Sequence, residues 1–110
     1  MVAALIENDI RTLLESPSSG EDAPTLLRIE DALTTGYARA MALEADQYRL
    51  ERRIADVAVE LADEELGLPD PELKRLAQEL KATNCDLRQL RILLESLRLR
   101  ADATRAACLA

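Results

Sequence analysis

The stretch LKRLAQELKATNCDLRQLRILLESLRLRADATRAAC, residues 73–108, decides the fold. Small or apolar residues recur along it in strictly alternating steps of three and four. These seam residues are Leu73, Leu76, Leu80, Thr83, Leu87, Leu90, Leu94, Leu97, Ala101, Thr104 and Cys108. Such a repeat places its members on one face of a helix, and a sustained seven-residue period is typical of helices that coil around a partner. The stretch therefore predicts one long helix with an apolar seam.

The preceding stretch carries a second seam of the same kind. Its members are Leu26, Ile29, Leu33, Gly36, Ala40, Leu43, Gln47, Leu50, Ile54, Val57 and Leu61. Between the two seams, residues 66–71 read LGLPDP, where Gly67 suits a helix C-cap and Pro71 suits the first position of the next helix. A connection this short forces its helices antiparallel. We predict an all-α fold in which residues 25–110 form a long antiparallel coiled-coil hairpin, turning at 66–71.

The segment before the hairpin divides into a helix and a linker. Ile6, Ile10 and Leu13 share one face of a helix, so residues 1–16 are predicted to form a short amphipathic helix. Residues 17–24 contain proline, glycine and serine and are predicted to form a linker. Asp22 is the expected N-cap of the helix that follows.

Antiparallel seams pair residues whose numbers add to a constant, and a turn centred near residues 68 and 69 gives a sum of 137. This register predicts the seam pairs Gly36 with Ala101 and Ile29 with Cys108. The flanking charges then predict the pairs Glu30 with Arg105 and Arg53 with Asp86, and bring Arg39 near Arg100. Two seam residues are not large and apolar: Gly36 and Gln47. We expect both to set the register, although Gln47 could instead line a pocket.

The second long helix also has an apolar row on the side away from its seam. Cys85, Ile92, Leu99 and Ala106 recur every seven residues, with Leu93 beside them, where a solvated arm should be polar. Either the N-terminal helix folds over Leu99 and Ile92, or a second copy covers the row. We expect a homodimer that forms a helical bundle. Its predicted interface residues are Cys85, Ile92, Leu93, Leu99, Ala106, Ile6, Ile10 and Leu13.

Composition narrows the classes of function. The formal net charge is −7, which argues against a surface for nucleic acid or for an anionic membrane. The sequence has no histidine, and its two cysteines are 23 residues apart, so histidine-based catalysis and a metal site within one chain are not expected. No apolar run is long enough to cross a membrane, and no leader pattern is evident, so we expect a cytoplasmic protein. We predict no catalytic, cofactor or metal residues.

Two functions are consistent with these patterns. The first is a non-catalytic interaction or assembly module that acts as a homo-oligomer and binds a protein partner through its acidic helix, residues 25–66, or through the hairpin tip. The alternative is a small all-α dimeric enzyme or ligand-binding protein whose pocket is lined by arginine and takes an anionic small molecule.

Overall fold

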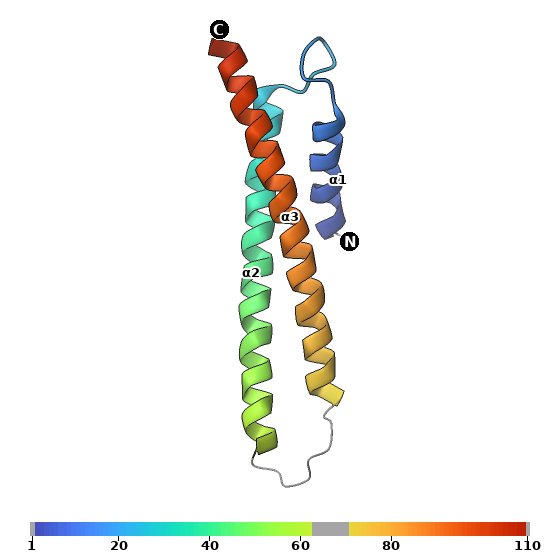
Figure 1. Ribbon diagram of the computed structural model, residues 1–110, viewed down its shortest axis with the longest axis vertical. Coiled ribbons are helices and arrows are strands. Elements are labelled where there is room, and N and C mark those ends of the chain that lie inside the picture. Colours follow the sequence, from blue (N-terminus) through green and yellow to red (C-terminus); the bar gives the residue numbers. More distant parts are fainter. Residues whose placement is uncertain (1, 63–70, 110) are drawn as a thin grey trace. The chain divides into compact units, whose positions relative to one another are not determined.

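The chain forms three helices (Figure 1), and the computed structural model describes residues 2–62 and 71–109. Helix α1 spans Val2–Glu15, α2 spans Leu26–Ala62 and α3 spans Pro71–Leu109. No strand occurs within these described ranges. The all-α class agrees with the sequence prediction, whereas the predicted division into residues 1–16, 17–24 and 25–110 stays a prediction. Pro71 begins α3 as expected, while the rest of the predicted turn lies outside the described residues.

Local hydrogen bonds explain where α1 ends and α2 begins. The Ser16 hydroxyl donates to the carbonyl of Thr12, and Pro17 follows, so the helix stops. At the other end of the linker, the Thr25 hydroxyl accepts a hydrogen bond from the backbone N–H of Arg28 at 3.2 Å. Thr25 is therefore the N-cap of α2, and the prediction of Asp22 for this role is wrong.

The helices contribute to two compact units. The first contains residues Met1–Ala40 and Gln89–Ala110, so it combines α1 with the first part of α2 and the last part of α3. All three helices supply fully buried side chains to its core, namely Ile10, Ile29, Leu90, Leu97 and Ala101. The core is entirely aliphatic at these positions, in keeping with a sequence that has no phenylalanine or tryptophan.

The second unit contains residues Met41–Arg88, which belong to α2 and α3. Leu50, Val57 and Leu76 are buried at its centre, and four partly buried seam residues pack around them: Ile54, Leu61, Leu73 and Leu80. Among the described residues of this unit, α2 and α3 are the only helices, so each seam is covered from one side. This explains why Leu61, Leu73 and Leu80 of the second unit stay partly buried beside buried leucines such as Leu50 and Leu76.

Several large apolar side chains of α2 point to solvent. Leu27 and Met41 are 69% and 64% exposed. The two tyrosines of the chain, Tyr37 and Tyr48, are 44% and 62% exposed. The outer stripe of α2 is thus apolar at intervals, and its aromatic residues take no part in the core.

Candidate interaction surfaces

The outer face of α3 exposes a row of apolar side chains at helical spacing. Ile92 and Leu99 are 61% and 58% exposed, and Ala106 is exposed as well. Cys85 is exposed and Leu93 is half-buried. A row of apolar side chains at helical spacing is unusual on a solvated helix. The expectation that α1 covers Leu99 and Ile92 is wrong, whereas cover by a second copy remains a prediction.

Helix α1 lies against α2 and α3 within the first unit (Figure 1). Its three apolar residues predicted at an interface, Ile6, Ile10 and Leu13, are 7%, 0% and 2% exposed. They are buried against the helices of their own chain in this arrangement. An α1 exchanged between two copies would bury the same residues, so their place in a dimer stays a prediction.

Arg100 of α3 holds the C-terminal end of α1. Its guanidinium donates to the carbonyls of Leu14 at 2.9 Å, Ser16 at 2.6 Å and Pro17. The last carbonyls of a helix have no partner within the helix, and α1 has no basic residue of its own in its last turn. That missing base was the one sequence signal for this contact. The predicted approach of Arg39 to Arg100 overlooked it.

Gly36 lets the three helices of the first unit approach closely. A Cβ atom built at this position would lie 2.5 Å from Leu94 Cδ2 and 3.3 Å from Ile10 Cδ1. The position of Gly36 is therefore closely packed, while its role in setting the register stays a prediction. The three atoms nearest to the added Cβ belong to Leu94 and Ile10, and none belongs to Ala101, the predicted seam partner. Cys108 is exposed, so the predicted seam pair with the fully buried Ile29 is wrong.

Gln47 forms a polar layer in the seam of the second unit. Its Nε2 donates to Oδ1 of Asn84 at 2.6 Å, and the bond is partly buried. Asn84 also lines a groove of about 430 Å³ with Ile54, Ala77, Leu80, Lys81, Cys85 and Arg88. The hydrogen bond satisfies an amide that would otherwise face aliphatic neighbours. Sequence patterns identified Gln47 as special but gave no sign of its partner.

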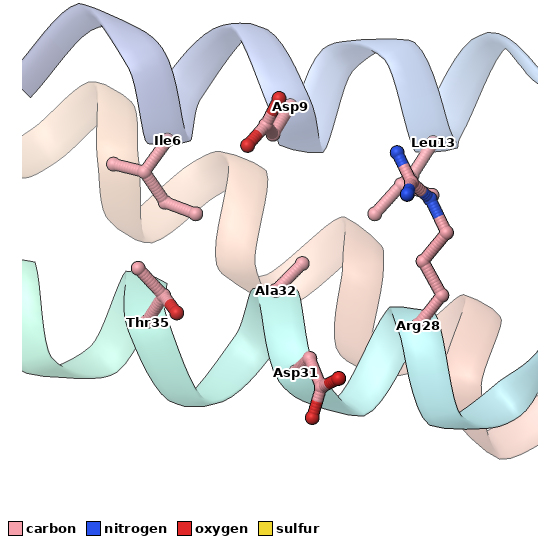
Figure 2. A pocket seen from close by; sticks show the side chains of 7 residues that line it. All are labelled: Ile6, Asp9, Leu13, Arg28, Asp31, Ala32 and Thr35. Carbon is pink, nitrogen blue, oxygen red and sulfur yellow. The ribbon is translucent and has the colours of Figure 1, made fainter.

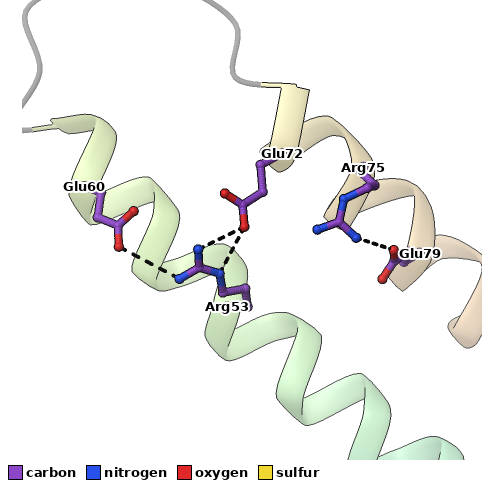
Figure 3. Close-up of polar contacts among 5 residues, drawn as sticks. All are labelled: Arg53, Glu60, Glu72, Arg75 and Glu79. Carbon is purple, nitrogen blue, oxygen red and sulfur yellow. Dashed lines mark hydrogen bonds and ion pairs between the residues drawn. The ribbon is translucent and has the colours of Figure 1, made fainter.

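Charged side chains connect the helices along their flanks. Glu30 accepts a hydrogen bond from Arg105 at 3.1 Å, which confirms that predicted pair. Arg53 donates to Glu72 at 2.9 Å and lies 3.9 Å from Glu60, so the predicted pair with Asp86 is replaced (Figure 3). Hydrogen bonding to Glu72, reinforced by its negative charge, raises the pKa of Arg53 above its ordinary value.

Within each unit, these contacts join residues of α2 and α3 in opposite numerical order. Within the second unit Gln47 meets Asn84, whereas Arg53, farther along α2, meets Glu72 near the start of α3. Within the first unit Glu30 meets Arg105, whereas Gly36 meets Leu94. Higher numbers on one helix thus accompany lower numbers on the other.

A small groove of about 220 Å³ lies between α1 and α2 (Figure 2). Asp9 comes from α1, while Arg28, Asp31 and Thr35 come from α2, and the apolar lining is Ile6, Leu13 and Ala32. Figure 2 shows Arg28 extending toward Leu13. Two carboxylates accompany this single guanidinium, so the groove is poorly suited to an anion.

A larger groove of about 530 Å³ runs beside the linker. Its lining is mostly small or apolar and comprises Ser18, Leu99, Arg100, Ala103, Thr104, Ala107 and Cys108. The guanidinium of Arg100 is already bound to the three carbonyls of α1 and the linker. This groove therefore extends the apolar outer face of α3.

The described residues were also compared with the patterns of metal sites and of membrane-crossing helices, and neither pattern occurs among them. Within residues 2–62 and 71–109, no three His, Cys, Asp or Glu side chains come together in a way that could hold a metal ion. In the same ranges, no helix combines the length and the apolar character needed to cross a membrane. Comparisons of the chain with protein-family models, with curated proteins and with solved structures found no match.

Proposed function

We propose that the chain is a non-catalytic helical assembly module that acts as a homodimer through the outer face of α3. The observation that carries this proposal is the exposure of Ile92 and Leu99, two large aliphatic side chains one heptad apart on the same face. Complete burial of such a side chain contributes about 1.5–3 kcal/mol. A two-fold dimer buries Ile92 and Leu99 of both copies in one interface, because both copies present the same surface.

The proposal includes the arrangement of the long helices. The α2 and α3 seams form an antiparallel coiled-coil hairpin, and two hairpins pack into a bundle. The half-covered seam of the second unit supports this, since Ile54, Leu61, Leu73 and Leu80 are only partly buried there. A bundle of more helices would cover aliphatic seams that two helices leave partly open.

The experiment is sedimentation equilibrium of the full chain at about 1–100 µM, a range that spans a micromolar dimer dissociation constant. The native chain is expected to sediment as a dimer. Ile92→Lys is expected to shift it to monomer, because each copy would place a charge at the centre of an apolar contact. Because Ile92 is exposed in the single chain, the Ile92→Lys variant should retain the helical circular dichroism signal of the native protein.

Leu27→Lys is the matched control. Leu27 is as exposed as Ile92, but it lies on the outer side of α2. It should leave the dimer intact. A native chain that sediments as a monomer of 12.2 kDa throughout this range would refute the proposal.

The acidic α2 offers a surface for a different protein partner. Helix α2 contains seven acidic and five basic residues, and Glu51, Asp56 and Glu60 are exposed. A basic partner is the chemistry that this surface would recognise. The hairpin tip proposed for the same role lies outside the described residues.

The alternative function, an arginine-lined site for an anionic small molecule, has weaker support. The groove of about 430 Å³ in the second unit is lined by Lys81 and Arg88 and by no acidic residue, so it could attract an anion. Both cations are exposed, however, which leaves them solvated. The groove does contain the exposed thiol of Cys85, but no carboxylate lines it to act as a general base.

A further inference from the structure

A row of charged residues runs beside the apolar row of α3, and its sign changes in the middle. Lys81, Arg88, Glu95 and Asp102 follow one another at intervals of seven residues, each three residues after or four before a member of the apolar row. All four side chains are exposed. Because all belong to the single helix α3, helical spacing alone places them along one side of the apolar row.

We propose that a second copy of the chain docks on this face with its α3 antiparallel, so that Arg88 meets Glu95 and Lys81 meets Asp102 of the other copy. This inference rests on the homodimer proposed above and specifies its direction and register. In an antiparallel pair, the same flank of each helix meets its counterpart, and residue numbers across the contact add to a constant. A sum of 183 matches every charge of the row with its opposite.

The other registers are worse. In a parallel pair the charged flank of one copy would lie beside the other, uncharged flank of its partner (residues 82, 89, 96 and 103), so its charges would have no counterpart. Sliding the antiparallel pair by one heptad sets Arg88 against Arg88 in one direction and Glu95 against Glu95 in the other. Like charges placed opposite each other are destabilising, so the row selects one register among these.

The contacts within one chain leave the four charged residues able to pair with those of a second copy. Within the described residues, neither Lys81 nor Arg88 forms an ion pair. Glu95 accepts a hydrogen bond from Arg98 at 2.8 Å, and Asp102 accepts one from Arg105 at 2.8 Å. A carboxylate has two oxygens and accepts further donors, so both acids can bind a second cation.

The opposite flank of the apolar row favours close approach. It consists of Ala82, Gln89, Ser96 and Ala103, again at seven-residue intervals, and all four are exposed. In the proposed register Ala82 lies near Ala103 of the other copy and Gln89 near Ser96, since their numbers add to 185, two more than on the charged flank. The flank contains no charge and no large side chain, so the backbones can come near enough to bury Ile92 and Leu99.

The first test exchanges the charges and measures the dimer dissociation constant by sedimentation. Arg88→Glu and Glu95→Arg alone are each expected to raise it at least about tenfold, since each change affects two symmetry-related pairs. The double variant R88E/E95R restores opposite charges and should return to within about threefold of the native value. A native dimer that responds to neither single change, or a double variant no tighter than the singles, would overturn this register and leave the homodimer itself standing.

The second test uses disulfide cross-linking in a C85S/C108S background. The proposed register puts residue 92 almost opposite its own copy, so Ile92→Cys should form a covalent dimer under mild oxidation. Leu99→Cys is the matched control, because it would lie about 15 residues, or about 22 Å, from its own copy. Cross-linking at both positions indicates a parallel pair, and cross-linking at neither indicates another interface; both results contradict the proposal. A native chain that is monomeric refutes the homodimer and this inference together.

Discussion

Replacing Gly36 by alanine tests whether α1, α2 and α3 meet as closely as the first unit requires. The added Cβ would lie 2.5 Å from Leu94 Cδ2, well inside van der Waals contact, and 3.3 Å from Ile10 Cδ1. Leu94 is 3% exposed and Ile10 is fully buried, so neither side chain has open space to move into. The methyl group must therefore displace packed atoms.

Two effects of opposite sign decide the magnitude. Alanine in place of glycine inside a helix stabilises by about 1 kcal/mol. Overpacking a filled core costs about 1–3 kcal/mol. We expect G36A to lower the free energy of unfolding by up to about 2 kcal/mol, with the clash outweighing the helical gain. The control is Ala38→Gly at an exposed position of α2. The stability lost in that variant measures the difference in helix propensity between alanine and glycine without any clash.

A second background turns this balance into a change of sign. Leu94→Val removes the conflicting Cδ2 atom and retains an atom near Cγ, which would be 3.5 Å from the new Cβ and in ordinary contact. In L94V, G36A should be stabilising by up to about 1 kcal/mol. The assay is urea unfolding followed by circular dichroism at fixed protein concentration, since a dimer's stability depends on concentration. If G36A stabilised the native and L94V backgrounds equally, the close approach of α3 to Gly36 would be refuted.

Three further predictions concern polar contacts. Arg100→Met should destabilise the protein by about 1–2 kcal/mol and speed hydrogen exchange in the last turn of α1. Arg100→Lys should have an intermediate effect, because an ammonium group cannot reproduce the guanidinium fork. Unchanged hydrogen exchange in α1 would contradict the role of Arg100. A double-mutant cycle of Gln47→Ala and Asn84→Ala should give a coupling of about 0.5–1.5 kcal/mol, and additive effects would exclude the hydrogen bond. The difference in Tm between the native chain and Arg53→Gln should be the same at pH 7 and pH 10. Because the folded-state pKa of Arg53 is raised, its contribution to stability is fully present below the ordinary arginine pKa and is lost only as the pH rises through the raised value. A Tm difference that is smaller at pH 10 than at pH 7 would therefore count against the Glu72 contact.

Local patterns were sufficient to predict the helices. Seam periodicity, Pro17 and Pro71 act on their own neighbours, so the helical class of the three segments could be predicted without knowledge of the fold. Burial of the apolar face of α1 followed from the same periodicity. The N-cap of α2 was missed because Asp22 and Thr25 are both capable caps, and the choice depends on where the first helical turn closes.

Contacts between helices were harder to predict. A seven-residue repeat looks the same after a shift of one heptad, and the leucines at 87, 90, 94 and 97 give one register no advantage over the next. Leu94 supplies the atom nearest to a Cβ built at Gly36, although Glu30 pairs with Arg105 as the predicted register requires. The position of α1 depends on the space left by Gly36 and on the reach of Arg100, which only the assembled first unit brings together.

The exposed tyrosines make the chain its own optical probe. With no tryptophan present, Tyr37 and Tyr48 provide all of its intrinsic fluorescence, and both lie on α2 outside the core. A contact confined to the outer face of α3 would leave their emission and their quenching by iodide unchanged. A partner bound over the outer side of α2 would shield them. A single unlabelled fluorescence titration can thus tell which helix a newly found partner occupies.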